Sequence, residues 1–177
     1  DMYVKCGELD KAQKAFEKLP RRDIVSWNAL IAGYAQYDMG EEALKFFRRM
    51  QDEGILANPL TFISVLKACG VAGNLETGEK VDTEIRKQGL MEKDVVLSTA
   101  LVDMYSKCGA LDKARNVFDQ IPNPNVVSWS ALISGYAQNG LGNEALKCFT
   151  QMKDSGICPN EVTYICVLKA CGLVQSV

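Results

Sequence analysis

The sequence of 177 residues contains no histidine. This absence excludes Ser-His-Asp and Cys-His catalysis within the chain, because both arrangements use an imidazole as the general base. It also excludes zinc sites with histidine ligands, including the H-x-E and C-x-x-C sites of nucleobase deaminases. Carboxylate pairs remain possible, but none stands apart from the repeat pattern. We therefore expect no enzyme activity, no metal site and no cofactor.

Long apolar runs are also missing, since none approaches the ~20 residues needed to span a bilayer. We therefore expect no membrane partner. The first residues, DMYVKCGELDKAQKAF, are neither a signal nor a transit sequence. Both ends of the chain fall inside the repeat pattern, which indicates a piece of a longer protein.

The seven cysteines are odd in number and form no C-x-x-C pair. Cys6 and Cys108 are 102 residues apart, as are Cys69 and Cys171. Because these positions follow the repeat, we expect the cysteines to be small core residues in a reducing compartment, with no disulfide or metal role.

Positive charge is scarce. The net charge is −2 and the isoelectric point is near 5.3. Nucleic-acid binders usually carry a basic balance, because phosphate contacts supply much of their affinity. Taken alone, the charge argues against a nucleic-acid partner. The hydrophobic content of 47% is sufficient for a packed core.

A long internal repeat organises the chain. DMYVKCGELDKAQKAFEKLP at residue 1 returns as DMYSKCGALDKARNVFDQIP at residue 103, and DIVSWNALIAGYAQ at residue 23 returns as NVVSWSALISGYAQ at residue 125. LKACG at residue 66 returns at residue 168, so all three share an offset of 102 residues. We call residues 1–75 the first copy and residues 103–177 the second copy.

Shorter units lie inside this period. Aligned on an apolar pair, the units are separated by 35, 36, 31 and 35 residues. The first three steps together make up the 102-residue offset. The aligned pairs are Leu30–Ile31, Val65–Leu66, Leu101–Val102, Leu132–Ile133 and Val167–Leu168.

Each unit has the pattern of two amphipathic helices. From Trp27, apolar residues recur at i, i+3, i+4 and i+7, on one helical face. Glu41 and Glu42 open a second helix, where acids favour the dipole, and Gly54 and Pro59 mark its end and the next start. The predicted core residues are Trp27, Leu30, Ile31, Tyr34, Ala43, Leu44, Phe47 and Met50, with their counterparts Trp129, Leu132, Ile133, Tyr136, Ala145, Leu146, Phe149 and Met152.

Such hairpins can bury their apolar sides only against their neighbours. The predicted fold is therefore all-α, an α-solenoid of stacked antiparallel helix-turn-helix hairpins with a concave surface and a right-handed superhelix. Helices are expected at residues 8–19, 24–36, 40–53, 60–69, 75–88, 95–107, 111–120, 126–138, 143–154 and 161–171.

Two repeat families have related spacings. Tetratricopeptide repeats bind peptides and have a steady period of 34 residues, which this chain lacks. The endings GILAN and GICPN, and the pattern VSWNALI.GYAQ.G...EAL..F..M, resemble the pentatricopeptide repeat, abbreviated PPR. The cycle of unit lengths is similar to the PLS subclass of plant organelle proteins. That resemblance implies a partial S-type repeat at 1–23, a P-type at 24–58, an L-type at 59–94, an S-type at 95–125, a P-type at 126–160 and a partial L-type at 161–177.

The resemblance implies binding of single-stranded RNA, one nucleotide per repeat. In the family, the fifth and last residues of a repeat hydrogen-bond the base, and the second residue packs on it. Asn with Asn is similar to a pyrimidine pair, and a hydroxyl with Asn to an adenine pair. The base-reading pairs are Asn28 with Asn58, Thr99 with Asn125 and Ser130 with Asn160; the base-packing residues are Val25, Val96 and Val127. An alternative role for the asparagines, compatible with the first, is helix capping.

The L-type repeats depart from this pattern. Ile63 and Ile165 stand at the fifth position, and isoleucine cannot hydrogen-bond a base edge. Leu60 and Asp94 occupy the second and last positions of the repeat 59–94. No base is assigned there, and the resemblance implies contact with a protein editing cofactor instead.

The candidate phosphate contacts are Lys67, Lys107 and Lys169, four or eight residues after a fifth position on the first helices. Acids such as Glu41 and Glu144 fall on second helices, so a basic groove on an acidic body is expected; ordinary solvated surface is the alternative for the lysines. By resemblance, the parent protein is a chloroplast or mitochondrial factor for C-to-U RNA editing. The alternative function is a tetratricopeptide-like scaffold for proteins or peptides.

Overall fold

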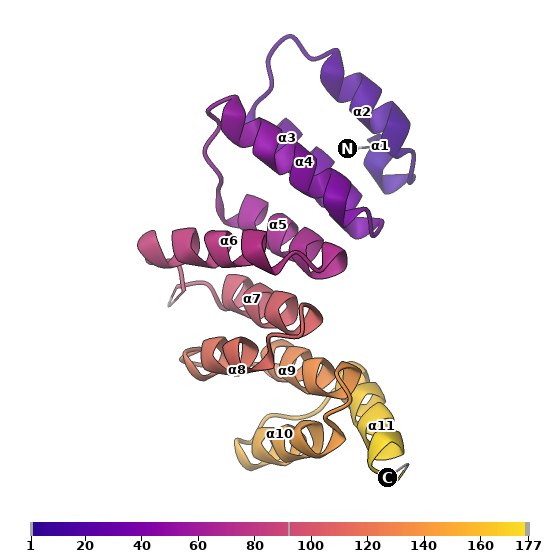
Figure 1. Ribbon diagram of the computed structural model, residues 1–177, viewed down its shortest axis with the longest axis vertical. Helices are drawn as coiled ribbons and strands as arrows, with labels where there is room; N and C mark the ends of the chain where they lie inside the picture. The colour runs from indigo at the N-terminus through magenta and orange to yellow at the C-terminus, as the bar shows by residue number, and fades with distance from the viewer. Residues whose placement is uncertain (1, 92, 176–177) are drawn as a thin grey trace. The chain divides into compact units, whose positions relative to one another are not determined.

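A computed structural model describes residues 2–91 and 93–175, and these residues contain helices and no strand (Figure 1). The chain divides into two compact units, Asp1–Ile85 and Arg86–Val177. Among the helices described, none is both long enough and apolar enough to cross a membrane.

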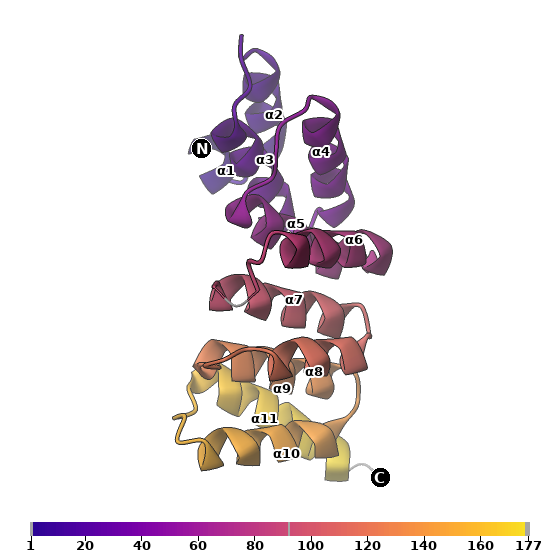
Figure 2. The same ribbon diagram turned by 90° about the vertical axis from the view of Figure 1, so that its left-hand side faces the viewer.

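The first unit is a stack of helical hairpins. The helix α3 packs against both α4 and α5, α4 packs against α5, and α2 contacts α3. Figure 2 shows α3 and α4 side by side as one hairpin. Its helices are α1 (Met2–Lys5), α2 (Leu9–Glu17), α3 (Ile24–Gln36), α4 (Gly40–Asp52), α5 (Pro59–Ala72) and the greater part of α6 (Leu75–Lys87).

The second unit repeats this construction. Each first helix contacts the second helix of its own hairpin and the first helix of the next, as α9 does with α10 and α11 (Figure 2). The helix α9 also packs against α7 and α8. The helices are α7 (Val95–Lys107), α8 (Leu111–Asp119), α9 (Val126–Gln138), α10 (Gly142–Asp154) and α11 (Glu161–Gln175).

The predicted hairpins are confirmed, and the predicted bounds of α3, α7 and α9 match the structure. The prediction ended α5 at Cys69, before a glycine, but the helix continues to Ala72. Gly70 is buried inside it, and the cap is Gly73, whose φ of 65° is left-handed. The short helix α1 was not predicted, because four residues carry too little periodicity to detect.

An edge-to-face aromatic pair joins consecutive hairpins in each copy. The ring centroids of Phe16 and Trp27 are 4.6 Å apart, and those of Phe118 and Trp129 are 4.5 Å apart. Each pair links a second helix to the first helix of the next hairpin. Such contacts contribute roughly 0.5–1.5 kcal/mol beyond their buried area. The two pairs are 102 residues apart in sequence and keep almost the same geometry.

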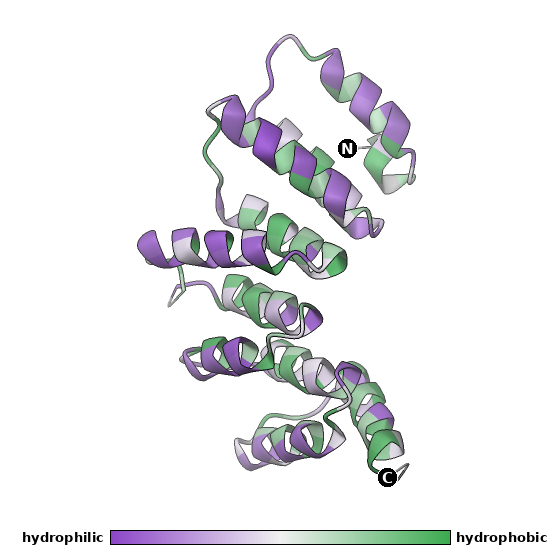
Figure 3. Cartoon of the chain, viewed as in Figure 1, coloured by the Kyte–Doolittle hydropathy of each residue, from purple (hydrophilic) through white to green (hydrophobic). Residues whose placement is uncertain are grey.

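The core of the first copy agrees fully with the prediction, and the second copy only in part. Every predicted core residue of the first copy is buried, but Tyr136, Leu146 and Phe149 are half-buried. In the first copy α6 follows α5, whereas no helix follows α11 within the described residues. Figure 3 shows the hydropathy of the helices, with α5 mainly hydrophobic and α4 and α10 carrying hydrophilic bands.

The cysteines are not uniformly core residues, which corrects the expectation from the sequence. Three are buried, but Cys6 and Cys158 are exposed, and Cys108 and Cys171 are partly so. Cys108 is the C-cap residue of α7, and Cys158 lies in the loop before α11, positions that no neighbouring hairpin covers. None of the seven forms a disulfide.

Close helix packing explains the glycine in the middle of α9. A Cβ atom built on Gly135 would lie 2.3 Å from Ser106 Oγ and 2.5 Å from Ser106 Cβ on α7. No side chain fits at these distances, so glycine sets how closely α7 and α9 approach.

We predict that Gly135→Ala lowers the free energy of unfolding by about 1–3 kcal/mol, because the added methyl overpacks this contact. Gly172→Ala on α11 is the matched control, since its Cβ would meet nothing within 4 Å. It should be neutral or stabilise by up to about 1 kcal/mol through helix propensity. Urea unfolding followed by circular dichroism measures both; equal effects would contradict the packing account.

Candidate nucleic-acid interface

The last residue of each repeat is the N-cap of the following helix. Asp23, Asn58, Asp94 and Asn125 cap α3, α5, α7 and α9, and each accepts a hydrogen bond from the backbone of the first turn. Asn160 does the same for α11, where the N–H of Thr163 donates to Asn160 Oδ1 at 2.9 Å. The capping role anticipated for the asparagines is therefore confirmed.

This cap fixes which way the amide faces. A backbone N–H can donate only to the oxygen, so Oδ1 of each asparagine points at its helix and Nδ2 points away. Asn125 Oδ1, for example, accepts from Val127 and Ser128 at 2.9 and 3.1 Å. Within the described residues, the Nδ2 groups of Asn58, Asn125 and Asn160 have no hydrogen-bond partner.

An aspartate in the same position presents an oxygen instead. The backbone and side chain of Ser26 donate hydrogen bonds to Asp23, and these lower the pKa of that carboxyl below its ordinary value. Asp23 is therefore a charged acceptor at neutral pH, whereas the asparagine caps are neutral donors on their outward side.

The fifth and last residues of the repeat 24–58 are hydrogen-bonded to each other. Asn28 Nδ2 donates to Asn58 Oδ1 at 3.1 Å. Thr61 Oγ1 lies 2.6 Å from Asn28 Oδ1 and donates to it. Asn28 is buried, with 5% of its surface exposed. Three side chains from α3, the loop and α5 thus form one polar group.

The repeat 126–160 has a matching group with different chemistry. Thr163 Oγ1 donates to Asn160 Oδ1 at 2.9 Å, and Ser130 Oγ lies 2.7 Å from Thr163 Oγ1. A hydroxyl has a single hydrogen. Either hydroxyl can donate in the bond between Ser130 and Thr163. When the hydrogen of Thr163 goes to Asn160, Ser130 donates to Thr163, and the lone pairs of Ser130 are left as acceptors.

The structure does not join the third predicted pair. Thr99 is half-buried, and its Oγ1 is inaccessible and has no hydrogen-bond partner in the described part of the chain. Asn125 caps α9 without contacting it. The counterpart of Thr61 is Ser128, whose hydroxyl bonds to the backbone of Asn125 instead.

The repeats at 59–94 and 161–177, which the resemblance assigned to the L type, hold no comparable polar group at their fifth positions within the described residues. Ile63 is half-buried on α5, and Ile165 is 47% exposed on α11. Asp94 uses one carboxylate oxygen to cap α7, accepting from Val96 and Leu97.

The second residue of each repeat is an exposed apolar side chain. All five are between 55% and 70% exposed, although they lie at the starts of well-packed helices. Isolated exposed apolar residues are common, but these recur at the same position of each helix. They are Val25, Leu60, Val96, Val127 and Val162.

The three lysines predicted to contact phosphate differ in whether their charge is paired. Lys67 and Lys169 are exposed on α5 and α11. Lys107 Nζ lies 2.7 Å from Asp103 Oδ2 on the same helix. That ion pair partly neutralises the charge of Lys107. Lys107 is therefore a weaker candidate for a phosphate contact than its position eight residues after Thr99 predicted.

Sequence reasoning missed Thr61 and Thr163, which connect each asparagine cap to a fifth-position side chain. Both are the third residue of their repeat, 102 residues apart. The pattern Asn-x-x-Thr identified a helix cap but not the further bond to a residue 33 positions earlier (for Asn28 and Ser130 alike).

Two family profiles match the sequence at segments that recur with the 102-residue repeat. The PPR repeat family profile matches residues 22–70 and 124–172, and the PPR repeat profile matches residues 1–24 and 96–123. The chain belongs to the PPR repeat family. Related proteins extend over almost its whole length. A mitochondrial pentatricopeptide repeat-containing protein of Arabidopsis thaliana is 43% identical over 171 residues, covering 97% of this chain and 30% of the relative.

A chloroplastic pentatricopeptide repeat-containing protein of the same plant is 41% identical over 171 residues, again 97% of this chain and 24% of the relative. This PPR chain therefore spans less than a third of the length of these relatives.

Solved structures show the same fold. The pentatricopeptide repeat protein PPR10, in complex with an 18-nucleotide psaJ RNA element, superposes with a TM-score of 0.78 at 24% identity, over 95% of this chain and 26% of that one. The PPR domain of Arabidopsis thaliana protein-only RNase P 1, in complex with tRNA, gives 0.67 at 14% identity, over 97% and 94%. At these identities the likeness establishes the α-solenoid fold alone.

We predict that Asn125→Ala lowers the free energy of unfolding by about 1 kcal/mol, because α9 loses its cap. Asn125→Asp keeps the accepting oxygen and should leave stability nearly unchanged. Asn123→Ala, in the exposed loop just before, controls for the loss of an amide and should change stability by less than about 0.5 kcal/mol. Thermal melts distinguish these outcomes; a loss as large for Asn123→Ala would contradict the capping role.

Proposed function

We propose that this chain binds single-stranded RNA sequence-selectively, one base per repeat. The fifth and last residues hydrogen-bond the base edge, and the second residue packs on its face. The observation that carries this proposal is that in both P-type repeats a fifth-position side chain and a capping asparagine share one hydrogen-bonded group. Each group has unpaired polar capacity left over, near an exposed valine.

The comparisons support an RNA partner. PPR10 is bound to an RNA element and the PPR domain of protein-only RNase P 1 to tRNA. Helical repeats can read single-stranded bases through their exposed Watson–Crick edges, using two or three side chains for each base. The net charge of −2 means that base contacts must supply a larger share of the affinity than in a strongly basic protein.

In the arrangement in which Ser130 donates to Thr163, hydrogen-bond matching favours adenine over guanine in the repeat 126–160. Ser130 offers an acceptor and Asn160 Nδ2 offers a donor. The Watson–Crick edge of adenine presents the N6 amino donor beside the N1 acceptor, which is complementary. Guanine held in the same orientation presents an acceptor at O6 and a donor at N1, so both contacts would be mismatched, whereas cytosine has the same donor and acceptor pattern as adenine. A complementary pair of contacts discriminates between bases by about 1–3 kcal/mol.

The donors and acceptors that remain unpaired in the repeat 24–58 favour a pyrimidine. Both oxygens of the Asn28–Asn58 pair are already used, so mainly N–H donors remain. Two neighbouring donors suit adjacent acceptors, such as N3 and O2 of cytosine. The pair Thr99 and Asn125 has the residue types of an adenine pair, and Thr99 must change rotamer to take part.

The L-type repeats 59–94 and 161–177 read no base in this proposal. Their apolar residues Leu60, Ile63 and Ile165 would contact a protein editing cofactor. The remaining repeat assignments are the partial S-type 1–23, the P-type 24–58 and 126–160, and the S-type 95–125. The chain is then a PLS-type module.

The parent protein is proposed to be a C-to-U editing specificity factor of a plant organelle. Relatives that are named mitochondrial or chloroplastic support an organelle. With no histidine in the chain, the deamination chemistry would come from elsewhere in the parent or from a partner, and this chain would select the site.

RNA titration tests the function. An oligonucleotide reading pyrimidine, any base, adenine, adenine, 5′ to 3′ in chain order, should bind more tightly than its scrambled form and than single-stranded DNA. The variant Asn160→Asp replaces a donor by an acceptor and keeps the cap, so it should shift the preference at the fourth base from adenine towards guanine. Asn125→Asp is the matched variant and should shift only the third base.

Fluorescence anisotropy with all four bases at each position gives the preferences. Equal binding to every oligonucleotide, or none at low salt, would overturn RNA reading and favour the protein-scaffold function. A selective protein whose preference ignores Asn160→Asp would show that the residue assignment is wrong.

A second variant tests the role of the hydrogen bonds that connect Ser130, Thr163 and Asn160. Thr163→Val removes the acceptor that holds the Ser130 hydroxyl, which can then donate or accept. Adenine selectivity at the fourth base should fall by roughly three- to tenfold, a part of the discrimination of one base contact pair. Thr163→Ser should restore it, and Thr61→Val should act only at the first base. Loss of selectivity at every position would indicate a general structural effect instead.

A further inference from the structure

In the first copy, two arginines cover the aromatic pair that joins the hairpins. The guanidinium of Arg22 lies 5.3 Å from the ring centre of Phe16, and that of Arg49 lies 5.7 Å from Trp27. Glu53 Oε1 joins them, at 2.9 Å from Arg22 and 3.4 Å from Arg49. The aromatic faces are therefore occupied by cations from the same chain.

The second copy keeps the aromatic pair and loses this cover. At the positions 102 residues further on, Arg22, Arg49 and Glu53 are replaced by Pro124, Gln151 and Ser155. Proline, glutamine and serine carry no charge, and two of them are much shorter than the residues that they replace. The substitutions replace both arginines and the glutamate that pairs with each of them in the first copy.

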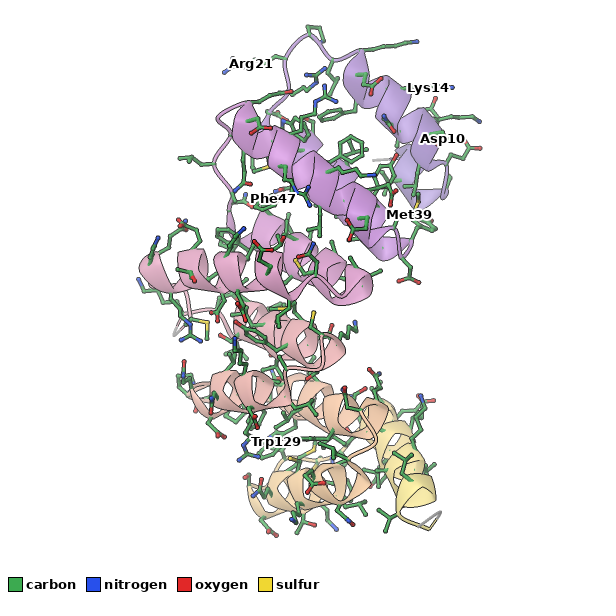
Figure 4. The ribbon with its side chains drawn as sticks, in the orientation of Figure 1. Asp10, Lys14, Arg21, Met39, Phe47 and Trp129 are labelled. Atoms are coloured by element: carbon green, nitrogen blue, oxygen red, sulfur yellow. The ribbon has the colours of Figure 1, made fainter. Side chains whose placement is uncertain are left out.

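A cleft of about 460 Å³ lies at this place in the second unit. Its lining residues come from α8, α9, α10 and the loops that adjoin them, and Figure 4 marks Trp129 there. This volume is within the usual range for small-ligand sites. The lining includes Phe118, Ile121, Pro124, Trp129, Gln151 and Asp154.

Arg115 replaces only one of the two missing cations. Its guanidinium lies 5.8 Å from the ring centre of Phe118, and it bonds to Asp119 and Gln151. In the described residues no cation lies over Trp129, and Asp154 on the cleft wall has no ion-pair partner. Trp129 is buried, with 5% of its surface exposed, so the cleft combines a small exposed part of an indole that has no cation over it with an unpaired carboxylate.

We infer that this cleft binds the side chain of an arginine from a protein partner. The guanidinium takes the place over Trp129 that Arg49 takes over Trp27, and Asp154 supplies the opposite charge. A planar guanidinium stacks on an aromatic face and forms directed hydrogen bonds, which a lysine ammonium does not match. RNA phosphate is disfavoured, because Asp119 and Asp154 line the cleft.

Two-dimensional ¹⁵N–¹H NMR of the whole chain tests this inference. The chain has two tryptophans, whose indole N–H signals are assigned by single Trp→Phe variants. A capped tripeptide with a central arginine should shift the Trp129 signal saturably and leave the Trp27 signal unchanged. Peptides with central lysine and norleucine should bind at least about tenfold more weakly, since they lack the planar cation.

Variants that exchange the residues of the two copies sharpen the test. Pro124→Arg, Gln151→Arg and Ser155→Glu together fill the cleft with residues that the first copy already accommodates, and should abolish the shift. Arg49→Gln with Glu53→Ser opens the first copy, so that Trp27 should begin to respond.

Circular dichroism checks that each variant is folded. No saturable shift with the arginine peptide, equal binding of norleucine, or unchanged binding by the filled variant would each overturn the inference. If the filled variant does not fold, the opened first copy decides it, because a silent Trp27 there would also count against the site.

Discussion

Each hairpin of this chain has one apolar side, and the need to bury that side against the next hairpin governs everything else in the structure. The edge-to-face contacts Phe16–Trp27 and Phe118–Trp129 are the points where this stacking is most specific. Because Trp129 is held from one side, the adjacent Ser130 faces the start of α11. The polar group at that helix start is therefore a product of hydrophobic packing.

The asparagine caps show that fold and candidate interface share atoms. One half of each amide satisfies backbone donors that a helix start would otherwise leave unpaired. The other half is turned outward by the same bond. The interface therefore needs no separate framework to orient it, and the orientation of Asn160 is as secure as the first turn of α11. Thr163 also forms a hydrogen bond with Ser130, so the position of the Ser130 hydroxyl is fixed by the same helix start.

Periodicity in the sequence was enough to predict the hairpins, the bounds of α3, α7 and α9, and eight buried core residues of the first copy. It could not show that Asn28 and Ser130 are buried, or that Thr99 has an unpaired hydroxyl, because these depend on contacts between residues about 33 apart. The predicted helix at residues 60–69 was too short, because α5 continues through the buried Gly70 to Ala72. A glycine inside a helix is tolerated at a cost that packing can offset, so a glycine alone does not show where a helix ends.

Position 160 has a further consequence for how such a chain can change over time. Aspartate and asparagine cap a helix about equally well, and their codons differ by a single base. A mutation there passes between an outward donor and an outward acceptor without disturbing the array. Under the proposed base reading, drift at these sites is therefore decoupled from folding, and a repeat protein of this kind can acquire a new base preference while its architecture stays the same.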